Sequence, residues 1–281
     1  MNNRSMKRYF PIFALPTLIA FIVGFVVPFI LGVYLSFCKF TTVTDAQWIG
    51  FSNYTKIFSD GDFLHALGFT VLFTIVAVIT INVLAFVIAL ALTRGIKGTN
   101  IFRTVFFMPN LIGGIILGYI WQLIINGVLS YFGKTITFDA SYGFWGMIIL
   151  TNWQSIGYMM IIYVAGLQNI PGELIEAAQI DGASKWATLF KVKIPMMMSS
   201  ITICTFLTLT NSFKMFDQNL ALTAGAPSNK TQMLALNIYK TFYDRPGTEG
   251  VGQAKAVVFF LIVAAIALLQ LRATKSKEVQ Q

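Results

Sequence analysis

The chain has 281 residues, of which 56% are hydrophobic and 11% charged, and its mean hydropathy is +0.72. A soluble domain is nearer half apolar and a quarter charged, so this composition excludes an ordinary soluble domain and indicates that lipid is the main solvent. The net charge of +9 falls in short loops between apolar blocks, which favours membrane orientation over nucleic-acid binding. Cys38 and Cys204 predict neither a disulfide framework nor a metal site.

Six segments are long and apolar enough to cross the hydrocarbon core as helices, which takes about 20 residues. In chain order they are Phe10–Phe37, Leu67–Leu92, Val105–Ile125, Gly146–Leu167, Ile194–Phe213 and Val251–Leu271. The first is too long for a secretory signal of roughly 7–15 apolar residues, so we expect a retained spanning helix. The third and fifth segments are the weakest, because Asn110, Gln122 and Asn211 interrupt or border them.

Lys and Arg in the short loops predict the orientation. With both termini inside, twelve of the 20 Lys and Arg residues fall on the cytoplasmic side. The sequence therefore predicts an all-α integral membrane protein with six transmembrane helices and both termini cytoplasmic, in a single transmembrane domain over residues 1–281. We expect the first spanning helix at 10–37, a core of five spanning helices over 67–271 and a cytoplasmic loop at 171–195.

The loop at 171–195 predicts a helix, a hinge and a second helix. Pro171 suits a first helical turn, and Glu173 and Glu176 near that end interact favourably with the helix dipole. Gly182 is a natural terminator, because glycine accepts the left-handed conformation that ends helices.

After the hinge, the second helix places Trp186, Leu189 and Phe190 on one face, and Pro195 opens the next spanning helix. One interpretation is an amphipathic helix resting on lipid, with its lysines touching anionic headgroups. The other is a docking surface for a protein, because two alanines beside a carboxylate allow another backbone to approach closely. Periodicity alone leaves both open.

Part of the loop reads Glu-Ala-Ala, three residues, Gly, nine residues, a branched residue, any residue and Ile-Pro. The residues of this pattern are Glu176, Ala177, Ala178, Gly182, Val192, Ile194 and Pro195. The pattern resembles the EAA loop of permease subunits of binding-protein-dependent ABC importers, in which isoleucine and leucine are usual at the last two apolar positions. In that family the loop forms the coupling helices, which seat in a cleft of the ATPase subunit and convey its closure to the spanning helices.

Further stretches follow the order expected of the sugar-type permeases that resemble the first membrane subunit of the maltose importer. They are WIGFSNYTKIFSD (48–60), FRTVFFMPN (102–110), YVAGLQNIPGELIEAAQIDGAS (163–184), FDQNLALTAGAP (216–227) and IYKTFYD (238–244). That subunit carries extra N-terminal helices and a large periplasmic insertion, which this sequence lacks. The resemblance therefore implies the compact six-helix version of the type I ABC importer transmembrane domain.

The resemblance also implies functional residues. ATPase coupling would rest on Glu176, Ala177, Ala178, Asp181, Gly182, Trp186, Phe190 and Pro195. The substrate pathway would use the middle of the fourth span and the end of the fifth, and polar residues in spans usually face the bundle interior or a cavity. The candidates are Asn110, Thr151, Gln154, Ser155, Tyr158, Asn211 and Ser212. Interhelical hydrogen bonding explains polar residues in a bundle equally well, so both roles stay open.

The sequence carries no P-loop, because Gly127 and Gly133 beside its GKT tripeptide are separated by five residues where the motif needs four. We therefore expect no enzymatic activity, no cofactor and no metal, with ATP bound by a partner. The expected function is half of the translocation pathway for a sugar, such as an oligosaccharide or glycoside, in the bacterial cell membrane. Expected partners are a second, different EAA-loop permease, two ATP-binding cassette subunits, an extracytoplasmic sugar-binding protein and membrane lipid.

An ion-coupled secondary transporter is the alternative. Proton coupling usually relies on an Asp, Glu or His within the membrane, and the six segments contain none; the nearest acid is Asp217. The inverted repeats of many such carriers are not visible either. A membrane sensor or assembly factor would leave the EAA loop unexplained.

Overall fold

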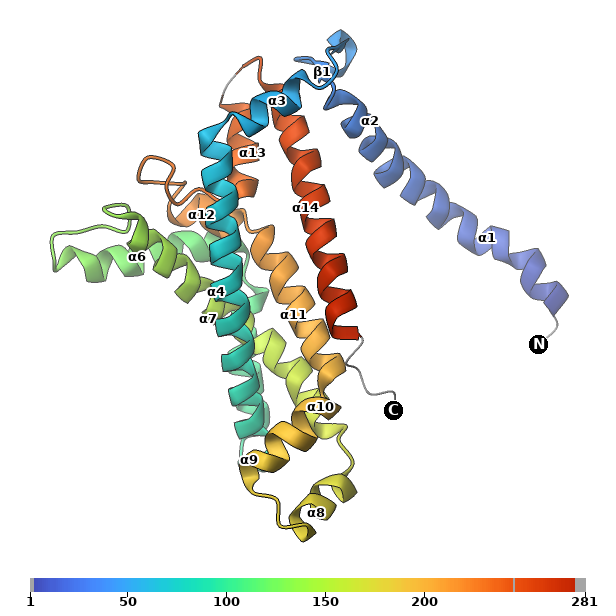
Figure 1. Cartoon of the computed structure of the whole chain (residues 1–281), viewed down its shortest axis with the longest axis vertical. Helices are drawn as coiled ribbons and strands as arrows, with labels where there is room; N and C mark the ends of the chain where they lie inside the picture. Colours follow the sequence, from blue (N-terminus) through green and yellow to red (C-terminus); the bar gives the residue numbers. More distant parts are fainter. Residues whose placement is uncertain (1–2, 245, 276–281) are drawn as a thin grey trace. The chain divides into compact units, whose positions relative to one another are not determined.

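A computed structural model describes residues 3–244 and 246–275, which are mostly helical (Figure 1). The helices are α1 (Asn3–Phe21), α2 (Val27–Leu35), α3 (Ser52–Phe58), α4 (Gly61–Leu92), α5 (Thr99–Phe107), α6 (Gly114–Ser130), α7 (Ala140–Gln168), α8 (Gly172–Ile180), α9 (Lys185–Thr188), α10 (Ile194–Met196), α11 (Met198–Phe213), α12 (Asp217–Leu222), α13 (Leu234–Tyr243) and α14 (Glu249–Lys275). The chain divides into two compact units: Met1–Gly61 with Ile238–Phe260, and Asp62–Asn237 with Leu261–Gln281.

The apolar helices confirm the helical membrane fold. Among the described residues, four continuous stretches are long and apolar enough to cross a membrane: Phe10–Leu35, Gly61–Leu92, Ala140–Gln168 and Glu249–Ala273. Two further candidates are bent pairs, Thr99–Leu111 with Gly114–Ser130 at 101° and Lys185–Met196 with Met198–Phe213 at 72°. Counting each bent pair as one span gives up to six.

The prediction of one continuous third helix over Val105–Ile125 is wrong. Helix α5 ends at Phe107, and the 3-10 turn η3 (Met108–Leu111) carries Pro109 in its first turn. A proline inside a helix removes one backbone hydrogen bond and clashes with the preceding turn. The backbone then becomes extended, with ψ 141° at Gly113, before α6 begins. This break produces the 101° bend.

The prediction that Pro195 opens the fifth spanning helix is also wrong. Pro195 lies in α10, which continues from α9 through the π-helical turn η4 (Leu189–Lys193). The spanning helix α11 starts only at Met198, after a kink at Met197 where φ is −96° and ψ is 9°. Pro195 therefore lies near the end of the helical stretch Lys185–Met196, just before the 72° bend to Met198–Phe213.

In the larger unit, the core forms around α4 and α7. Every fourth residue of α4 from Phe73 to Ala89 is at most 1% exposed; these are Phe73, Ala77, Ile81, Ala85 and Ala89. Helix α7 contributes Met147, Leu150 and Met160 to the same cluster. The alanines let neighbouring helices approach closely, which is how helices pack when lipid supplies no hydrophobic drive between them.

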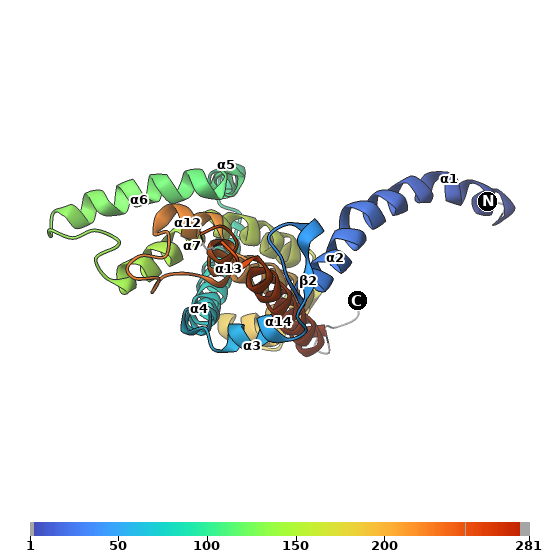
Figure 2. The same ribbon diagram turned by 90° about the horizontal axis from the view of Figure 1, so that it is seen from above.

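Glycines bring three more helices of this unit into close contact. A Cβ atom at Gly157 of α7 would overlap the carbonyl of Phe106, so α5 crosses α7 with its backbone against that glycine. A Cβ atom at Gly118 of α6 would likewise overlap Ala221 of α12. Seen from above, α6 runs beside α12 (Figure 2). These contacts hold the broken third span against the rest of the unit.

The smaller unit contains a two-stranded antiparallel sheet, β1 (Cys38–Lys39) with β2 (Gln47–Trp48), besides α1, η1 (Ile22–Val26), α2, η2 (Val43–Asp45) and α3. The buried Asn53 of α3 fixes the start of β1 by donating hydrogen bonds to the carbonyls of Ser36 at 3.0 Å and Cys38 at 2.8 Å.

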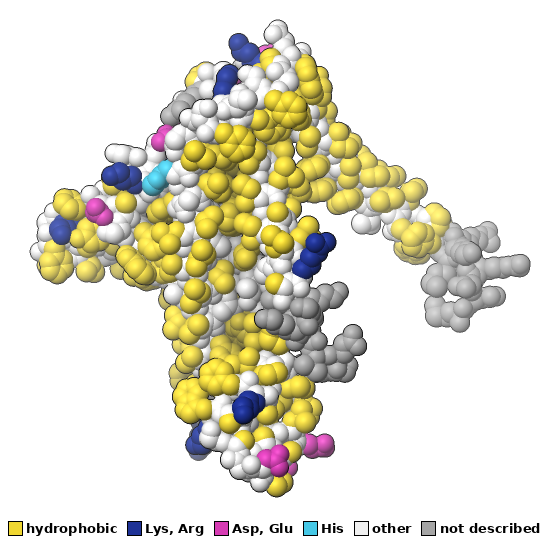
Figure 3. Space-filling model, viewed as in Figure 1, with side chains coloured by type: hydrophobic (Ala, Val, Ile, Leu, Met, Phe, Trp, Pro, Cys, Tyr) yellow, Lys and Arg dark blue, Asp and Glu magenta, His cyan; other side chains and the backbone are white. Residues whose placement is uncertain are grey.

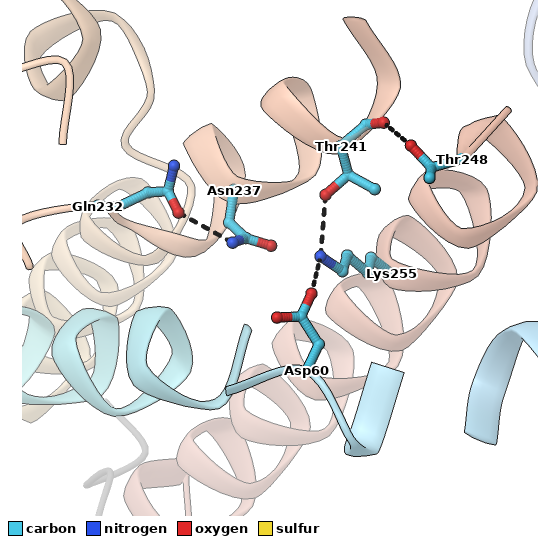
Figure 4. A network of polar contacts seen from close by, with 6 residues as sticks. All are labelled: Asp60, Gln232, Asn237, Thr241, Thr248 and Lys255. Atoms are coloured by element: carbon cyan, nitrogen blue, oxygen red, sulfur yellow. Dashed lines mark hydrogen bonds and ion pairs between the residues drawn. The ribbon is translucent and has the colours of Figure 1, made fainter. Parts of the chain in front are cut away.

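A buried cation also lies in the smaller unit. Lys255 of α14 is 2% exposed, and its Nζ lies 2.7 Å from Oδ2 of Asp60 and 2.9 Å from Oγ1 of Thr241 (Figure 4). The hydroxyl of Thr248 donates to the Thr241 carbonyl at 2.7 Å. A buried charge is tolerated when it is paired and hydrogen-bonded, and both conditions are met here.

Candidate functional site

A small polar cavity lies in the larger unit, among α4, α7, α11 and α12. Its volume is about 60 Å³, and its lining residues are Ile81, Thr151, Gln154, Ser155, Met159, Thr208, Asn211, Ser212, Met215 and Gln218. None of these described lining residues is charged. The structure therefore brings together five of the seven predicted substrate-pathway residues: Thr151, Gln154, Ser155, Asn211 and Ser212.

Helix periodicity explains why these residues meet. On α7, Thr151 lies three and four residues before Gln154 and Ser155, so the three share one face. On α11, Asn211 follows Thr208 by three residues, so these two side chains also share one face. The cavity forms where these two faces meet.

Gln154 links the cavity to two other elements of the unit. Its Nε2 donates to the carbonyl of Ile112 at 3.2 Å, in the break between α5 and α6. Its Oε1 accepts from Nε2 of Gln218 on α12 at 2.8 Å. In contrast, the side chains of Ser155 and Asn211 make no hydrogen bond to any residue within 3–244 or 246–275, so their polar groups remain available to a ligand.

The two remaining substrate-pathway candidates lie elsewhere. Asn110 is in the turn η3 and Tyr158 packs its ring 6.3 Å from that of Phe107, and neither lines the cavity. Sequence reasoning missed Gln218 and Met215, because both follow the predicted fifth span. The polar residues that follow Phe213 in the sequence were the signal that could have pointed to this part of the cavity.

A second polar chain braces the wall of the cavity. The hydroxyl of Tyr163 on α7 donates to Oδ1 of Asn82 on α4 at 2.7 Å. Asn82 in turn donates to Oγ1 of Thr208 on α11 at 2.9 Å. This chain is interhelical hydrogen bonding, the structural role that the sequence left open for polar residues in the spans.

The EAA loop (residues 171–195) folds as helix, hinge and helix. Helix α8 ends at Ile180, and Gly182 has φ 77°, the left-handed conformation that favours glycine. The backbone N–H of Gly182 donates to Gln179 at 3.0 Å, and that of Ala183 donates to Ala178 at 2.9 Å. This pair of bonds is a Schellman motif, so the hinge has a defined geometry.

Most of the predicted coupling residues of the loop are accessible. Glu176, Ala177, Asp181 and Gly182 are exposed, whereas Ala178 and Pro195 are half-buried. Apolar side chains are exposed as well, since Ile180, which sequence reasoning missed, is 86% exposed.

The aromatic face of the second helix is a stacked pair. The ring centroids of Trp186 and Phe190 lie 6.0 Å apart with an interplanar angle of 16°, and the two side chains are 70% and 60% exposed. Leu189, which was predicted to share this face, is half-buried, whereas Trp186 and Phe190 are exposed. Leu189 lies one helical turn after Lys185 and lines a cavity with it.

The loop lies at one end of the larger unit, beyond the ends of α4 and α11 (Figure 1). Figure 3 shows a hydrophobic surface over the middle of α4, with acidic side chains gathered at the end occupied by α8. The fold therefore combines apolar helices, a small polar cavity between them and an exposed helix–hinge–helix loop at one end. These features define a multi-helix membrane transport subunit.

Comparison with known proteins identifies the family. Residues 88–274 match the family described as "Binding-protein-dependent transport system inner membrane component". The chain is 42% identical to the probable starch degradation products transport system permease protein AmyD of Thermoanaerobacterium thermosulfurigenes, over 96% of this chain and 94% of that protein. It is 32% identical to the multiple sugar-binding transport system permease protein MsmF of Streptococcus mutans, over 95% of each. The chain therefore belongs to the family of binding-protein-dependent transport system inner membrane components.

A solved structure supports the fold. A chain of the bacterial alginate ABC transporter, in complex with alginate pentasaccharide-bound periplasmic protein, superposes with a TM-score of 0.80 at 20% identity, over 96% of this chain and 95% of that one. The predicted ABC importer type of transmembrane fold is thereby confirmed.

Proposed function

We propose that this protein is one membrane-spanning subunit of an ATP-driven importer of a neutral sugar, an oligosaccharide or glycoside. The observation that carries the proposal is the chemistry of the polar cavity. Its lining offers amide and hydroxyl groups and no charge among the described residues. Such groups satisfy sugar hydroxyls, whereas an amino acid, a phosphate or an ion would call for a charged partner. The permeases AmyD and MsmF, named for starch degradation products and multiple sugars, support the same substrate class.

The cavity volume supports a transport cycle in which this site opens and closes. About 60 Å³ holds roughly two water molecules, whereas ligand sites usually measure about 300–1,000 Å³. A sugar therefore enters only after α7, α11 and α12 separate. The absence of an acid from the described lining also counts against the ion-coupled alternative, because proton coupling needs a titratable group on the pathway.

The EAA loop would supply the energy for this opening. Its exposed carboxylate at Glu176 and its aromatic pair, Trp186 and Phe190, suit a cleft on a separate ATPase subunit, because exposed apolar clusters mark protein interaction sites. ATP would bind to that partner and drive the change through its higher affinity for one arrangement. Two such ATPases, a second EAA-loop permease and an extracytoplasmic sugar-binding protein would complete the importer, in the cell membrane with both termini cytoplasmic.

Uptake by reconstituted vesicles tests the proposal. The chain would be co-expressed with its partners, inserted into proteoliposomes containing ATP and supplied with a sugar-binding protein and labelled oligosaccharides. We expect uptake that requires ATP and survives dissipation of the proton gradient. Uptake driven by a proton or sodium gradient without the ATPase would contradict the proposal and favour a secondary transporter.

A further inference from the structure

A second and larger cavity lies beside the EAA loop, between that loop and the end of α4. Its volume is about 570 Å³. Three cationic side chains line it: Arg94 follows α4, Lys185 belongs to α9 and Lys193 belongs to η4. The cavity is therefore built from elements far apart in the sequence, and it belongs to neither the polar cavity nor the exposed face of the loop.

These cations have no counter-charge in the cavity. No described lining residue is a carboxylate, and the loop acids Glu173, Glu176 and Asp181 are exposed and outside the lining. Within residues 3–244 and 246–275, the side chains of Arg94, Lys185 and Lys193 form neither an ion pair nor a hydrogen bond. Three positive charges facing one space repel one another, so this cavity favours an anion.

The rest of the lining is partly apolar. Leu90, Ile175 and Leu189 line the same space, and Leu90 lies in the last turn of the apolar helix α4, which ends at Leu92. A free phosphate would leave these side chains unused, whereas a lipid presents a phosphate and hydrocarbon together. Lys and Arg at the end of a spanning helix attract anionic lipid headgroups.

We propose that this cavity binds the phosphate-bearing headgroup of an anionic phospholipid. Arg94, Lys185 and Lys193 hold the phosphate, and the lipid chains lie against the apolar wall. Because the site contains parts of α8, α9 and η4, a bound headgroup fixes the EAA loop against the end of α4. The proposal concerns lipid binding by the chain itself and is independent of which solute is transported.

Lipid retention by the purified full chain tests this site. The wild type would be compared with the triple variant Arg94→Gln, Lys185→Gln and Lys193→Gln after delipidation. Lys191→Gln is the matched control, because it removes the same charge from the same loop at a residue that is exposed and outside the lining. Phosphatidylglycerol, with phosphatidylcholine as the neutral comparison, would be added in detergent and the bound lipid counted by native mass spectrometry.

Each Lys or Arg near an anionic surface contributes about fivefold in affinity, so three give on the order of a hundredfold. We expect the affinity of the triple variant for phosphatidylglycerol to fall by about this factor. The affinity of Lys191→Gln for phosphatidylglycerol, and that of every variant for phosphatidylcholine, should barely change. Lys193→Gln alone should lower the affinity for phosphatidylglycerol about fivefold, and this single variant replaces the triple variant in the test if the triple variant fails to fold.

Three results would overturn the proposal. Equal retention of phosphatidylglycerol by all variants would show that the cavity holds no lipid. Displacement of the lipid by free glycerol 3-phosphate at similar concentration would show that a soluble phosphate is the ligand. A triple variant that keeps its lipid but no longer co-purifies with an ATPase would likewise replace the lipid by a protein contact.

Discussion

The side-chain amide of Gln218 donates a 2.8 Å hydrogen bond to Oε1 of Gln154 and so joins α12 to α7 at the polar cavity. Gln154 donates in turn to the carbonyl of Ile112, in the break of the third span. One side chain thus connects the cavity, the broken helix and α12. Because the cavity as it stands is too small for a sugar, we expect this pair of bonds to change during transport.

Gln218→Ala should alter transport more than stability. A hydrogen bond of this kind contributes about 0.5–1.5 kcal/mol, so we expect a change of up to about tenfold in the apparent KM for sugar, with altered selectivity among sugars. The measurement is uptake of several labelled oligosaccharides. Gln122→Ala is the control, because Gln122 donates a 2.9 Å bond to the Leu222 carbonyl but does not line the cavity. Identical uptake kinetics in the two variants would remove Gln218 from the pathway.

Substitutions in the EAA loop should uncouple the transporter without preventing insertion. Gly182→Pro cannot adopt φ 77°, because proline fixes φ near −65°, and the hinge would be lost. Glu176→Lys reverses an exposed charge on the proposed docking face. We expect both variants to reach the membrane and to lose ATP-dependent uptake. Glu173→Lys is the control, because it reverses a charge on the same helix at a residue outside the proposed coupling set, and it should retain most of the ATP-dependent uptake. Normal uptake by Gly182→Pro and Glu176→Lys would contradict the assignment of the loop to ATPase coupling.

The buried pair of Lys255 and Asp60 predicts an asymmetric double-mutant cycle. Asp60→Asn removes the carboxylate that lies 2.7 Å from Nζ of Lys255, a cation that is 2% exposed, and should cost about 3–5 kcal/mol of stability. Lys255→Met leaves a carboxylate that is 26% exposed, so its cost should be smaller. The double variant should recover much of the loss, as measured by thermal unfolding in mild detergent. Additive losses would mean that the pair does not interact in the folded protein.

Gly157 should be sensitive to a single added methyl group. A Cβ atom there would overlap the backbone of Phe106, which cannot move aside as a flexible side chain would, so Gly157→Ala should cost about 1–3 kcal/mol. Gly68→Ala is the matched control, because no atom lies within 4 Å of its added Cβ. Alanine is favoured over glycine in a helix by about 1 kcal/mol, so this control should unfold at a slightly higher temperature. Equal destabilisation by both would contradict the close contact of α5 with α7.

The sequence predicted those features that depend on local chemistry. Long apolar runs identified α4, α7 and α14. Gly182 predicted the hinge of the EAA loop, and the structure has a Schellman motif at that residue. Thr151, Gln154 and Ser155, which the family resemblance implied, lie three and four residues apart and therefore share one face of α7. In each case the determining interactions lie within a few residues of one another.

The features that depend on packing between distant segments were not predictable. Pro109 and Gly113 border a break that the apolar run conceals, so the third span was expected as one helix over Val105–Ile125. Gln218 enters the cavity only because α12 packs against the glycines of α6. The cavity beside the EAA loop likewise requires Arg94 to meet residues that follow it by 81 to 99 positions, from Ile175 to Lys193.

Co-purification tests the central claim most directly. The tagged wild-type chain and its Glu176→Lys variant would be extracted in mild detergent, and their companions identified by mass spectrometry. We predict that the wild type brings down a P-loop ATPase and a second permease with an EAA loop, and that the variant loses the ATPase while keeping the permease. Isolation of the wild-type chain alone, under conditions that preserve other membrane complexes, would contradict the assignment of an ATP-driven importer subunit.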